Sequence, residues 1–252
     1  MGENDGHDLP GLYRDCRLRL TALVSGLDAG ALATAVPACP GWAVRDVVAH
    51  LAAVADDAVA GRLTGPPPDE QTAAQVARLS EVGVPDILSL WEAVASQFEH
   101  LVGAFDVWPA LVDVASHEQD IRSAVGMPGA RDSEAVLHSS AWLLSELRVP
   151  VPLLVLTEDG EILTGPGGTA SPGGTASPGG AAIAGGTASP GGTASADGLA
   201  GLTLSTSRFE AFRWRMGRRS RAQIAALDWS GDPSPVLSHL TVFGPSTRDI
   251  DE

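Results

Sequence analysis

The sequence predicts an α+β protein: a bundle of antiparallel helices over residues 11–150, followed by a small α+β domain over 151–252. Up to residue 150, apolar side chains recur every three or four positions, which is the spacing of amphipathic helices. After residue 150 the apolar residues become consecutive, as in buried strands. A low-complexity insert at 165–198 then interrupts the second domain.

The first domain is expected to contain six helices. Pro109 fits the first turn of the fifth helix, and either Asp132 or Ser133 fits the N-cap of the sixth. Connections this short favour antiparallel neighbours in a bundle. Residues 1–10 are expected to form a flexible tail. The expected helices cover 12–27, 44–60, 70–81, 85–102, 109–125 and 133–147.

The second domain is expected to mix strands with short helices. Residues 151–156 and 161–164 resemble the two strands of a hairpin, and 199–206 alternate like a third strand. Residues 229–233 are expected to form a turn. Three helices are predicted for the rest of the domain, at 208–216, 221–227 and 235–242.

The insert at 165–198 repeats the hexad Gly-Gly-Thr-Ala-Ser-Pro. Its one large apolar residue is Ile183, so it offers little apolar surface to offset the entropy lost on ordering. We therefore expect this insert to be disordered.

The composition excludes some classes of function. Acidic residues outnumber basic ones 31 to 16, giving a net charge of -15, whereas nucleic acids and anionic membranes attract clustered basic residues. No run approaches the roughly 18 apolar residues that a membrane-spanning helix requires. The N-terminus is acidic, unlike a secretory signal, and two cysteines make no disulfide framework. These features predict a cytoplasmic protein that binds neither nucleic acid nor membrane.

His50 is the first candidate site residue. It lies among Val47, Leu51 and Val54, which form the apolar stripe of the predicted helix 44–60, so its imidazole is directed into the bundle. One interpretation is a core histidine satisfied by a single hydrogen bond. The other is a metal ligand.

Asp113 and His117 are the second and third candidates. They are four residues apart on the predicted helix 109–125 and therefore share a face. Together with His50 they make three ligands, the number that a catalytic zinc site takes from the protein while leaving one position open. A simple hydrogen bond between Asp113 and His117 is the alternative that the spacing also allows.

Several motifs resemble the mycothiol-dependent maleylpyruvate isomerase family of actinobacteria. The first is Cys-Pro-Gly-Trp-x-Val-Arg-Asp-Val-Val-Ala-His-Leu at 39–51, and the second is His-Glu-Gln-Asp-Ile-Arg at 117–122. Segments 207–210, 217–224 and 228–233 are similar to the C-terminal region of that family. The resemblance implies a DinB-like four-helix bundle in the N-terminal half.

The resemblance also implies a ligand set and a chemistry. A divalent metal, usually zinc, would be held by His50, His117 and Asp113, where the family has a glutamate that is one methylene longer. The other ring nitrogen of His117 would need a hydrogen-bond acceptor, which would be Asp120 or Glu118. Mycothiol would serve as thiol cosubstrate in the cis-trans isomerisation of maleylpyruvate or in S-transfer to another small electrophile. The partners would be small molecules, and the protein a monomer or a homodimer.

Four arginines follow in the second domain. A dianionic substrate needs cations, and the candidates for binding it are Arg213, Arg215, Arg218 and Arg219. Solvated surface arginines are the alternative interpretation for each of them.

Two residues of the first motif each allow two interpretations. Cys39 is either a small packing residue or a redox-sensitive thiol near the site. Trp42 either plugs the end of the bundle or lines the pocket.

Two functions stay open at this point. One is the metal- and mycothiol-dependent isomerase or S-transferase, and the other is a non-catalytic metal-binding or interaction protein that retains the bundle. A site closed by a fourth protein ligand would favour the second.

Overall fold

The computed structural model describes residues 7–63, 65–166 and 201–252. Most of the insert expected at 165–198 and the first six residues of the expected tail lie outside these ranges. The first helix begins at Leu9, inside the range expected to be a tail, and the side chain of Asp8 caps it by accepting from the backbone N–H of Gly11. The α+β class is confirmed: helices form the N-terminal part and a mixed four-stranded sheet the C-terminal part.

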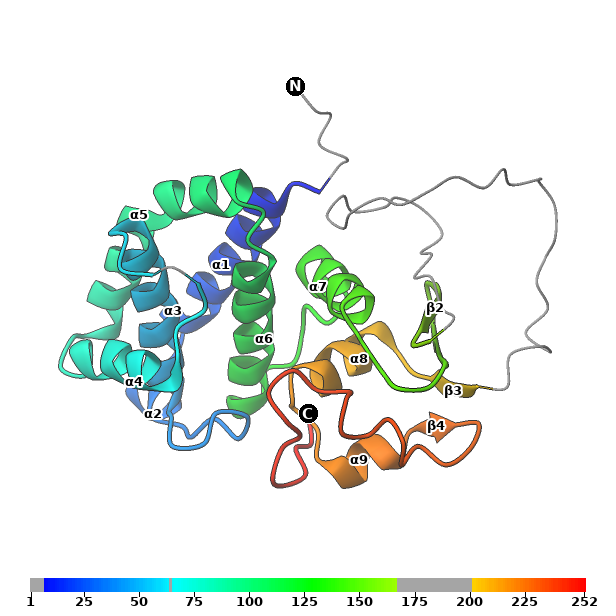
Figure 1. Ribbon diagram of the computed structural model, residues 1–252. Helices are drawn as coiled ribbons and strands as arrows, with labels where there is room; N and C mark the ends of the chain where they lie inside the picture. Colours follow the sequence, from blue (N-terminus) through cyan, green and yellow to red (C-terminus); the bar gives the residue numbers. More distant parts are fainter. Residues whose placement is uncertain (1–6, 64, 167–200) are drawn as a thin grey trace.

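Among the described residues, seven helices precede the sheet, six of them at the predicted places (Figure 1). Pro109 lies in the first turn of α6, and Ser133 caps α7. Helix α2 is a single turn capped by Asp28 and is not among the predicted elements. The helices are α1 (Leu9–Ser25), α2 (Ala29–Leu32), α3 (Val44–Val59), α4 (Asp69–Arg78), α5 (Val84–Ala104), α6 (Trp108–Ala124) and α7 (Glu134–Ser145).

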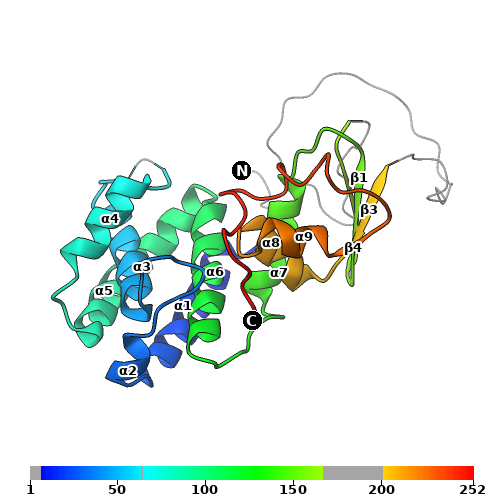
Figure 2. The same ribbon diagram turned by 90° about the horizontal axis from the view of Figure 1, so that it is seen from below.

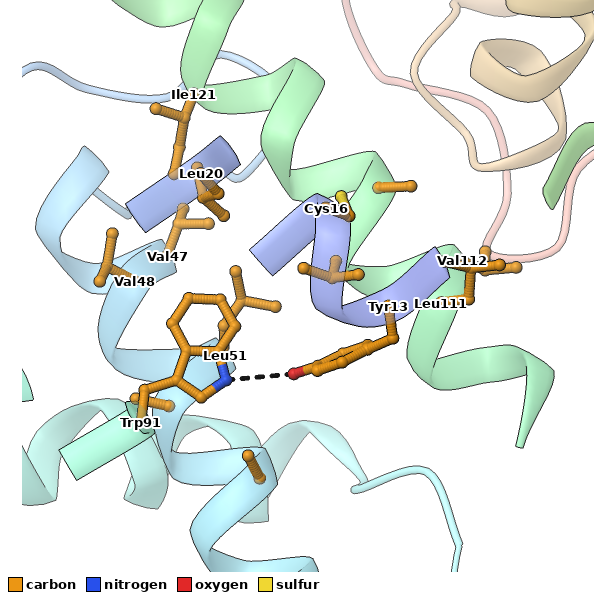
Figure 3. Close-up of a cluster of buried hydrophobic side chains, with 14 of the residues drawn as sticks. Tyr13, Cys16, Leu20, Val47, Val48, Leu51, Trp91, Leu111, Val112 and Ile121 are labelled. Carbon is orange, nitrogen blue, oxygen red and sulfur yellow. Dashed lines mark hydrogen bonds between the residues drawn. The ribbon is translucent and has the colours of Figure 1, made fainter. Parts of the chain in front are cut away.

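Helices α1, α3, α5 and α6 pack around one apolar core. Within it the indole of Trp91 donates a 3.1 Å hydrogen bond to the hydroxyl of Tyr13, so both buried polar groups are satisfied (Figure 3). Helix α6 stands between this core and the C-terminal part (Figures 1 and 2). Among the described residues, no helix has the length and apolar character needed to cross a membrane.

The C-terminal part is a small sheet with α7, α8 (Arg208–Arg215) and α9 (Arg221–Ala225) on one side of it (Figure 2). The strand order is β2-β1-β3-β4, with β1 antiparallel to β2 and parallel to β3. A second apolar core fills the space between the sheet and these helices. The strands are β1 (Leu153–Thr157), β2 (Gly160–Thr164), β3 (Leu202–Ser205) and β4 (Asp228–Trp229).

Two predictions for the chain end were wrong. The helix expected at 235–242 is a series of turns, which begins where Asp232 accepts hydrogen bonds from the backbone and hydroxyl of Ser234. Val236 and Leu240 are apolar because they are buried in the second core, and this gave the segment a helix-like spacing. Trp229, expected in a turn, belongs to β4, which pairs with β3.

The two ends of the insert lie close together on the sheet. Thr164, at the end of β2, and Leu202, at the start of β3, are both paired with Leu153 of β1. Glycines stand next to both: Gly165 has φ +94°, and a Cβ on it would lie 2.3 Å from the carbonyl oxygen of Val151. The chain can therefore turn off the sheet at Gly165 only because no side chain is there.

Candidate metal site

His50 is positioned by the start of α3. The backbone N–H of Ala43 donates to the Asp46 carboxylate, which fixes the first turn of that helix. His50 then lies on the inner face, with only 8 % of its side chain exposed, as the apolar stripe predicted. The indole of Trp42 lies against it, with ring centroids 5.3 Å apart.

Asp113 and His117 come from successive turns of α6. The side chain of His117 is 8 % exposed, whereas that of Asp113 is 34 % exposed. The structure brings both of them to His50: all three offer a ligand atom within 4.8 Å of the others. The ligand set expected from the sequence thus forms one cluster in space.

The carboxylate of Asp113 lies between the two imidazoles. Its Oδ2 is 3.4 Å from Nε2 of His50, and its Oδ1 is 3.4 Å from Nε2 of His117. A charge-assisted N–H···O bond is shorter, at about 2.7–2.9 Å. Two ligand atoms that each lie about 2.0–2.1 Å from a tetrahedral zinc ion are about 3.3–3.4 Å apart. Each of these two separations is therefore longer than a charge-assisted hydrogen bond and equal to that between two ligands of one zinc ion.

The charges of this cluster are strongly coupled. Burial raises the pKa of Asp113, but the neighbouring His117 and His50 outweigh burial and hold that pKa well below its usual range. Burial lowers the pKa of His117, but Asp113 outweighs it and raises that pKa well above normal. Without a metal the cluster therefore favours an ionised carboxylate and a protonated imidazole.

Asp120 joins His117 to the C-terminal part of the chain. Its Oδ2 lies 3.0 Å from Nδ1 of His117, and it accepts hydrogen bonds from Arg213 at 2.7 Å and Arg218 at 2.8 Å. Burial raises the pKa of Asp120, but the two arginines and His117 outweigh it and lower that pKa well below normal. The carboxylate is therefore ionised and fully paired.

Glu118, the other acceptor considered for His117, points to a different neighbour. It is fully buried against α1, where it accepts hydrogen bonds from Cys16 and Arg19, and it also pairs with Arg122 of its own helix. Of the two candidate acceptors, Asp120 contacts His117 and Glu118 does not.

Cys39 lies beside the site. Its Sγ is 3.8 Å from Nδ1 of His117 and 3.6 Å from Oδ2 of Asp120. The thiol therefore adjoins the outer nitrogen of His117 and not the side that faces Asp113. The sequence alone does not predict that Cys39 lies near the site, because a turn eleven residues before His50 does not fix where a side chain points.

The four arginines are distributed differently from one another. Arg213 is fully buried and pairs with Asp120 and Glu252. Arg215 donates to two backbone carbonyls. Arg219 pairs with Glu210 and Glu252. Arg218 pairs with Asp120 and keeps 12 % of its side chain exposed. Two of the four, Arg213 and Arg218, therefore reach the candidate site through Asp120.

Comparison with known proteins gives a family match. A family model described as the mycothiol maleylpyruvate isomerase N-terminal domain matches residues 13–140. Similar solved structures include that of a mycothiol-dependent maleylpyruvate isomerase, at 15% identity, and that of a histidine-to-alanine mutant of such an isomerase, at 14%. Each alignment covers 84% of this chain and 88% of the other, with a TM-score of 0.47. A search of curated proteins gave no match.

Proposed function

Because the chain belongs to the mycothiol maleylpyruvate isomerase family, we propose that it is a divalent-metal-dependent enzyme that uses mycothiol on a small electrophile. The reaction is cis-trans isomerisation of the maleylpyruvate type, or transfer of the thiol to a related electrophile. The observation that carries this proposal is the meeting of His50, Asp113 and His117, three donors of the kind that a catalytic metal takes from a protein.

The metal would be held by these three side chains. When bound, the cation would supply a positive charge that stabilises the thiolate form of a thiol. Asp113 is one methylene shorter than the glutamate of the family pattern, yet each of its oxygens lies 3.4 Å from an imidazole nitrogen. The shorter side chain is therefore compatible with the ligand role.

The surroundings of the cluster favour entry from one side. Trp42 covers both imidazoles, with centroids 5.3 Å from His50 and 6.4 Å from His117, and so keeps water from that side. Asp113 is the one member of the three with substantial exposure. The thiol and the electrophile would therefore approach from the Asp113 side.

The proposed isomerisation needs no oxidant or reductant. The thiolate sulfur adds to one carbon of the cis double bond, and the displaced electron pair moves onto the conjugated carbonyl. Rotation about the resulting single bond follows. The pair then returns, the carbon–sulfur bond breaks, and the thiolate leaves the trans product. In S-transfer the carbon–sulfur bond would instead persist in the product, and the displaced electron pair would take up a proton or depart with a leaving group of the electrophile.

An anionic substrate would need a cation near the cluster. Arg213, Arg215 and Arg219 are held by buried contacts within the chain. We therefore assign substrate binding first to Arg218, which pairs with Asp120 beside the cluster and keeps 12 % of its side chain exposed.

The alternative function, a non-catalytic metal-binding protein, has less support. A closed structural site would take a fourth ligand from the protein. In the described part of the chain, the group formed by His50, Asp113 and His117 has no fourth histidine, cysteine or carboxylate. This favours a site that keeps a position for a ligand from outside.

The test is the metal content of the purified protein, in the wild type and in His117→Ala. His138→Ala is a matched control, because His138 also pairs with a carboxylate one turn away, Glu134, but lies outside the group formed by His50, Asp113 and His117. We expect about one metal ion per chain in the wild type and the control, and none in His117→Ala. Turnover of maleylpyruvate with added mycothiol is then measured. A wild type that holds no metal and shows no thermal shift with zinc contradicts the proposal.

A further inference from the structure

We propose that Asp120 is a positioning residue that orients His117 and makes the metal site depend on the C-terminal part of the chain. This inference rests on the proposed function, because it assigns His117 to the metal. It concerns residues that lie outside the ligand set itself.

The contact with Asp120 fixes the orientation of the His117 ring. Its Nδ1 lies 3.0 Å from Oδ2 of Asp120, one turn along α6. An ionised carboxylate only accepts hydrogen bonds, so Nδ1 carries the hydrogen and a neutral His117 presents its lone pair at Nε2. That nitrogen is the one that faces Asp113. Metal-ligating histidines commonly donate their other N–H to a carboxylate in this way.

His50 provides the contrast. Its Nδ1 is buried and has no hydrogen-bond partner within the described part of the chain. The two imidazoles are therefore held by different means: His50 by packing in α3 and against Trp42, and His117 by a hydrogen bond. The orientation of His117 should accordingly be the one that a single polar substitution can change.

Asp120 is itself held in place by two arginines of the C-terminal part. Its Oδ1 accepts from Arg213 and its Oδ2 from Arg218, residues 93 and 98 positions later in the sequence. Both arginines are anchored in turn: Arg213 donates to the carbonyl of Ser116 and pairs with Glu252, and Arg218 donates to the carbonyl of Met216 at 2.7 Å. The carboxylate therefore has little freedom to rotate away from His117.

Arg213 lies at the end of α8 and Arg218 shortly after it, and α8 lies on the far side of α6 from α3 (Figure 2). A chain of contacts thus runs from the C-terminal part through an arginine and Asp120 to His117. Because metal affinity depends on the orientation of each ligand, a change at Arg218 should alter binding of a metal that Arg218 does not touch.

The experiment measures Co²⁺ binding to the full-length protein, by its affinity and by the visible absorption bands of the bound ion, which report ligand geometry. The variants are Asp120→Asn and Arg218→Met. Glu118→Gln is the matched control, because Glu118 lies on the same helix, is fully buried and pairs with two arginines, but does not touch His117.

We expect Asp120→Asn to weaken Co²⁺ binding about 10–100-fold and to shift the absorption bands. Arg218→Met should change both in the same direction by a smaller factor. Glu118→Gln should keep the wild-type affinity and spectrum even if its Tm falls.

Wild-type affinity and spectrum in both Asp120→Asn and Arg218→Met would overturn the inference. So would an equal loss in Glu118→Gln, because it would indicate a general loss of structure. If Asp120→Asn does not fold, Arg218→Met decides alone. A wild type that binds no Co²⁺ overturns the proposed function together with this inference, whereas a binding wild type with unaffected variants overturns the inference alone.

Discussion

The imidazoles of His50 and His117 meet edge to face, with centroids 5.4 Å apart and ring planes at 79°. One comes from α3 and the other from α6, so the packing of these two helices sets the distance between the rings. The edge-to-face arrangement lets each ring turn its Nε2 toward Asp113, whereas stacked rings would present their faces to each other. A substitution at His50, Asp113 or His117 should therefore alter the positions of the other two side chains.

Replacing Asp113 tests the departure from the family pattern. Asp113→Glu restores the longer carboxylate, and the partial exposure of this side chain leaves room for a methylene, so zinc affinity should stay within about tenfold of the wild type. Asp113→Asn removes the negative charge and should weaken zinc by more than about 100-fold, beyond the effect of a residue that only supports a ligand. Competition titration with a zinc chelator measures both. Equal affinities in Asp113→Asn and the wild type would contradict the ligand role.

Removing the metal should lower thermal stability. A ligand at 100 times its Kd stabilises the folded state by about 2.7 kcal/mol. For a chain of this size that corresponds to a rise in Tm of about 5–10 °C. Calorimetry of chelator-treated protein, with and without added zinc, measures the shift. His117→Ala should show none of it, and a zinc shift in that variant as large as in the wild type would place the metal elsewhere.

Stability toward acid should depend on Asp57, near the end of α3. Burial raises the pKa of Asp57, but hydrogen bonds from Gln75, Arg62 and Arg78 outweigh it and hold the pKa below its usual range. A lowered folded-state pKa contributes stability above the unfolded value of about 3.9, and this contribution is lost as the pH falls through the folded value. The wild type should therefore lose stability from about pH 5 downward.

Asp57→Asn removes this part of the pH dependence. At pH 7 it should cost about 1–3 kcal/mol, because a buried acceptor of charged donors is lost. Between pH 6 and pH 3 its free energy of unfolding should fall less than that of the wild type. Urea denaturation at the two values measures this, with Asp15→Asn on the exposed face of α1 as the control. A parallel decline in Asp57→Asn and the wild type would show that other groups dominate.

The buried hydrogen bond between Tyr13 and Trp91 should contribute measurably to the free energy of unfolding. Tyr13→Phe keeps the ring but leaves the indole N–H of Trp91 without a partner in the core, at a cost of about 1–3 kcal/mol. Urea unfolding followed by the tryptophan fluorescence of the whole protein measures the free energy of unfolding. Because the Tyr13 side chain contacts Trp91 and Phe98, and Tyr13→Phe changes no charge at neutral pH, the affinity for metal should change little. A stability equal to that of the wild type would mean that the indole finds another acceptor.

Much of the fold could be predicted because its helices carry a strong local pattern. The six long helices have regular apolar spacing, and their caps are recognisable residues such as Ser133 and Ser207. The segment 235–242 could not be predicted in the same way, since Val236 and Leu240 are apolar for burial under the sheet and not for a helix. Likewise β4 has only two residues, and its pairing with β3 across the fold defines it as a strand.

The candidate site shows the same division. His50, Asp113 and His117 follow from helical spacing and the family resemblance, because each lies on a predictable face of one helix. The arginine partners of Asp120 do not, since nothing local distinguishes Arg218 from Arg219, and the two donate to different carboxylates. Contacts between residues nearly a hundred positions apart depend on how the helices pack, which a single sequence does not display.

The position of the insert has a consequence for how this sequence can vary between relatives. Its two ends leave from strands on either side of β1, so they are about 10 Å apart whatever the length between them. For a loop of this many residues, one more hexad changes the closure free energy by only about 0.1 kcal/mol. Replication errors that add or remove a tandem repeat should therefore change the free energy of unfolding very little, so selection for stability should not remove them. We expect copy number to record recent ancestry, while Gly165, where the chain leaves the sheet, stays unchanged.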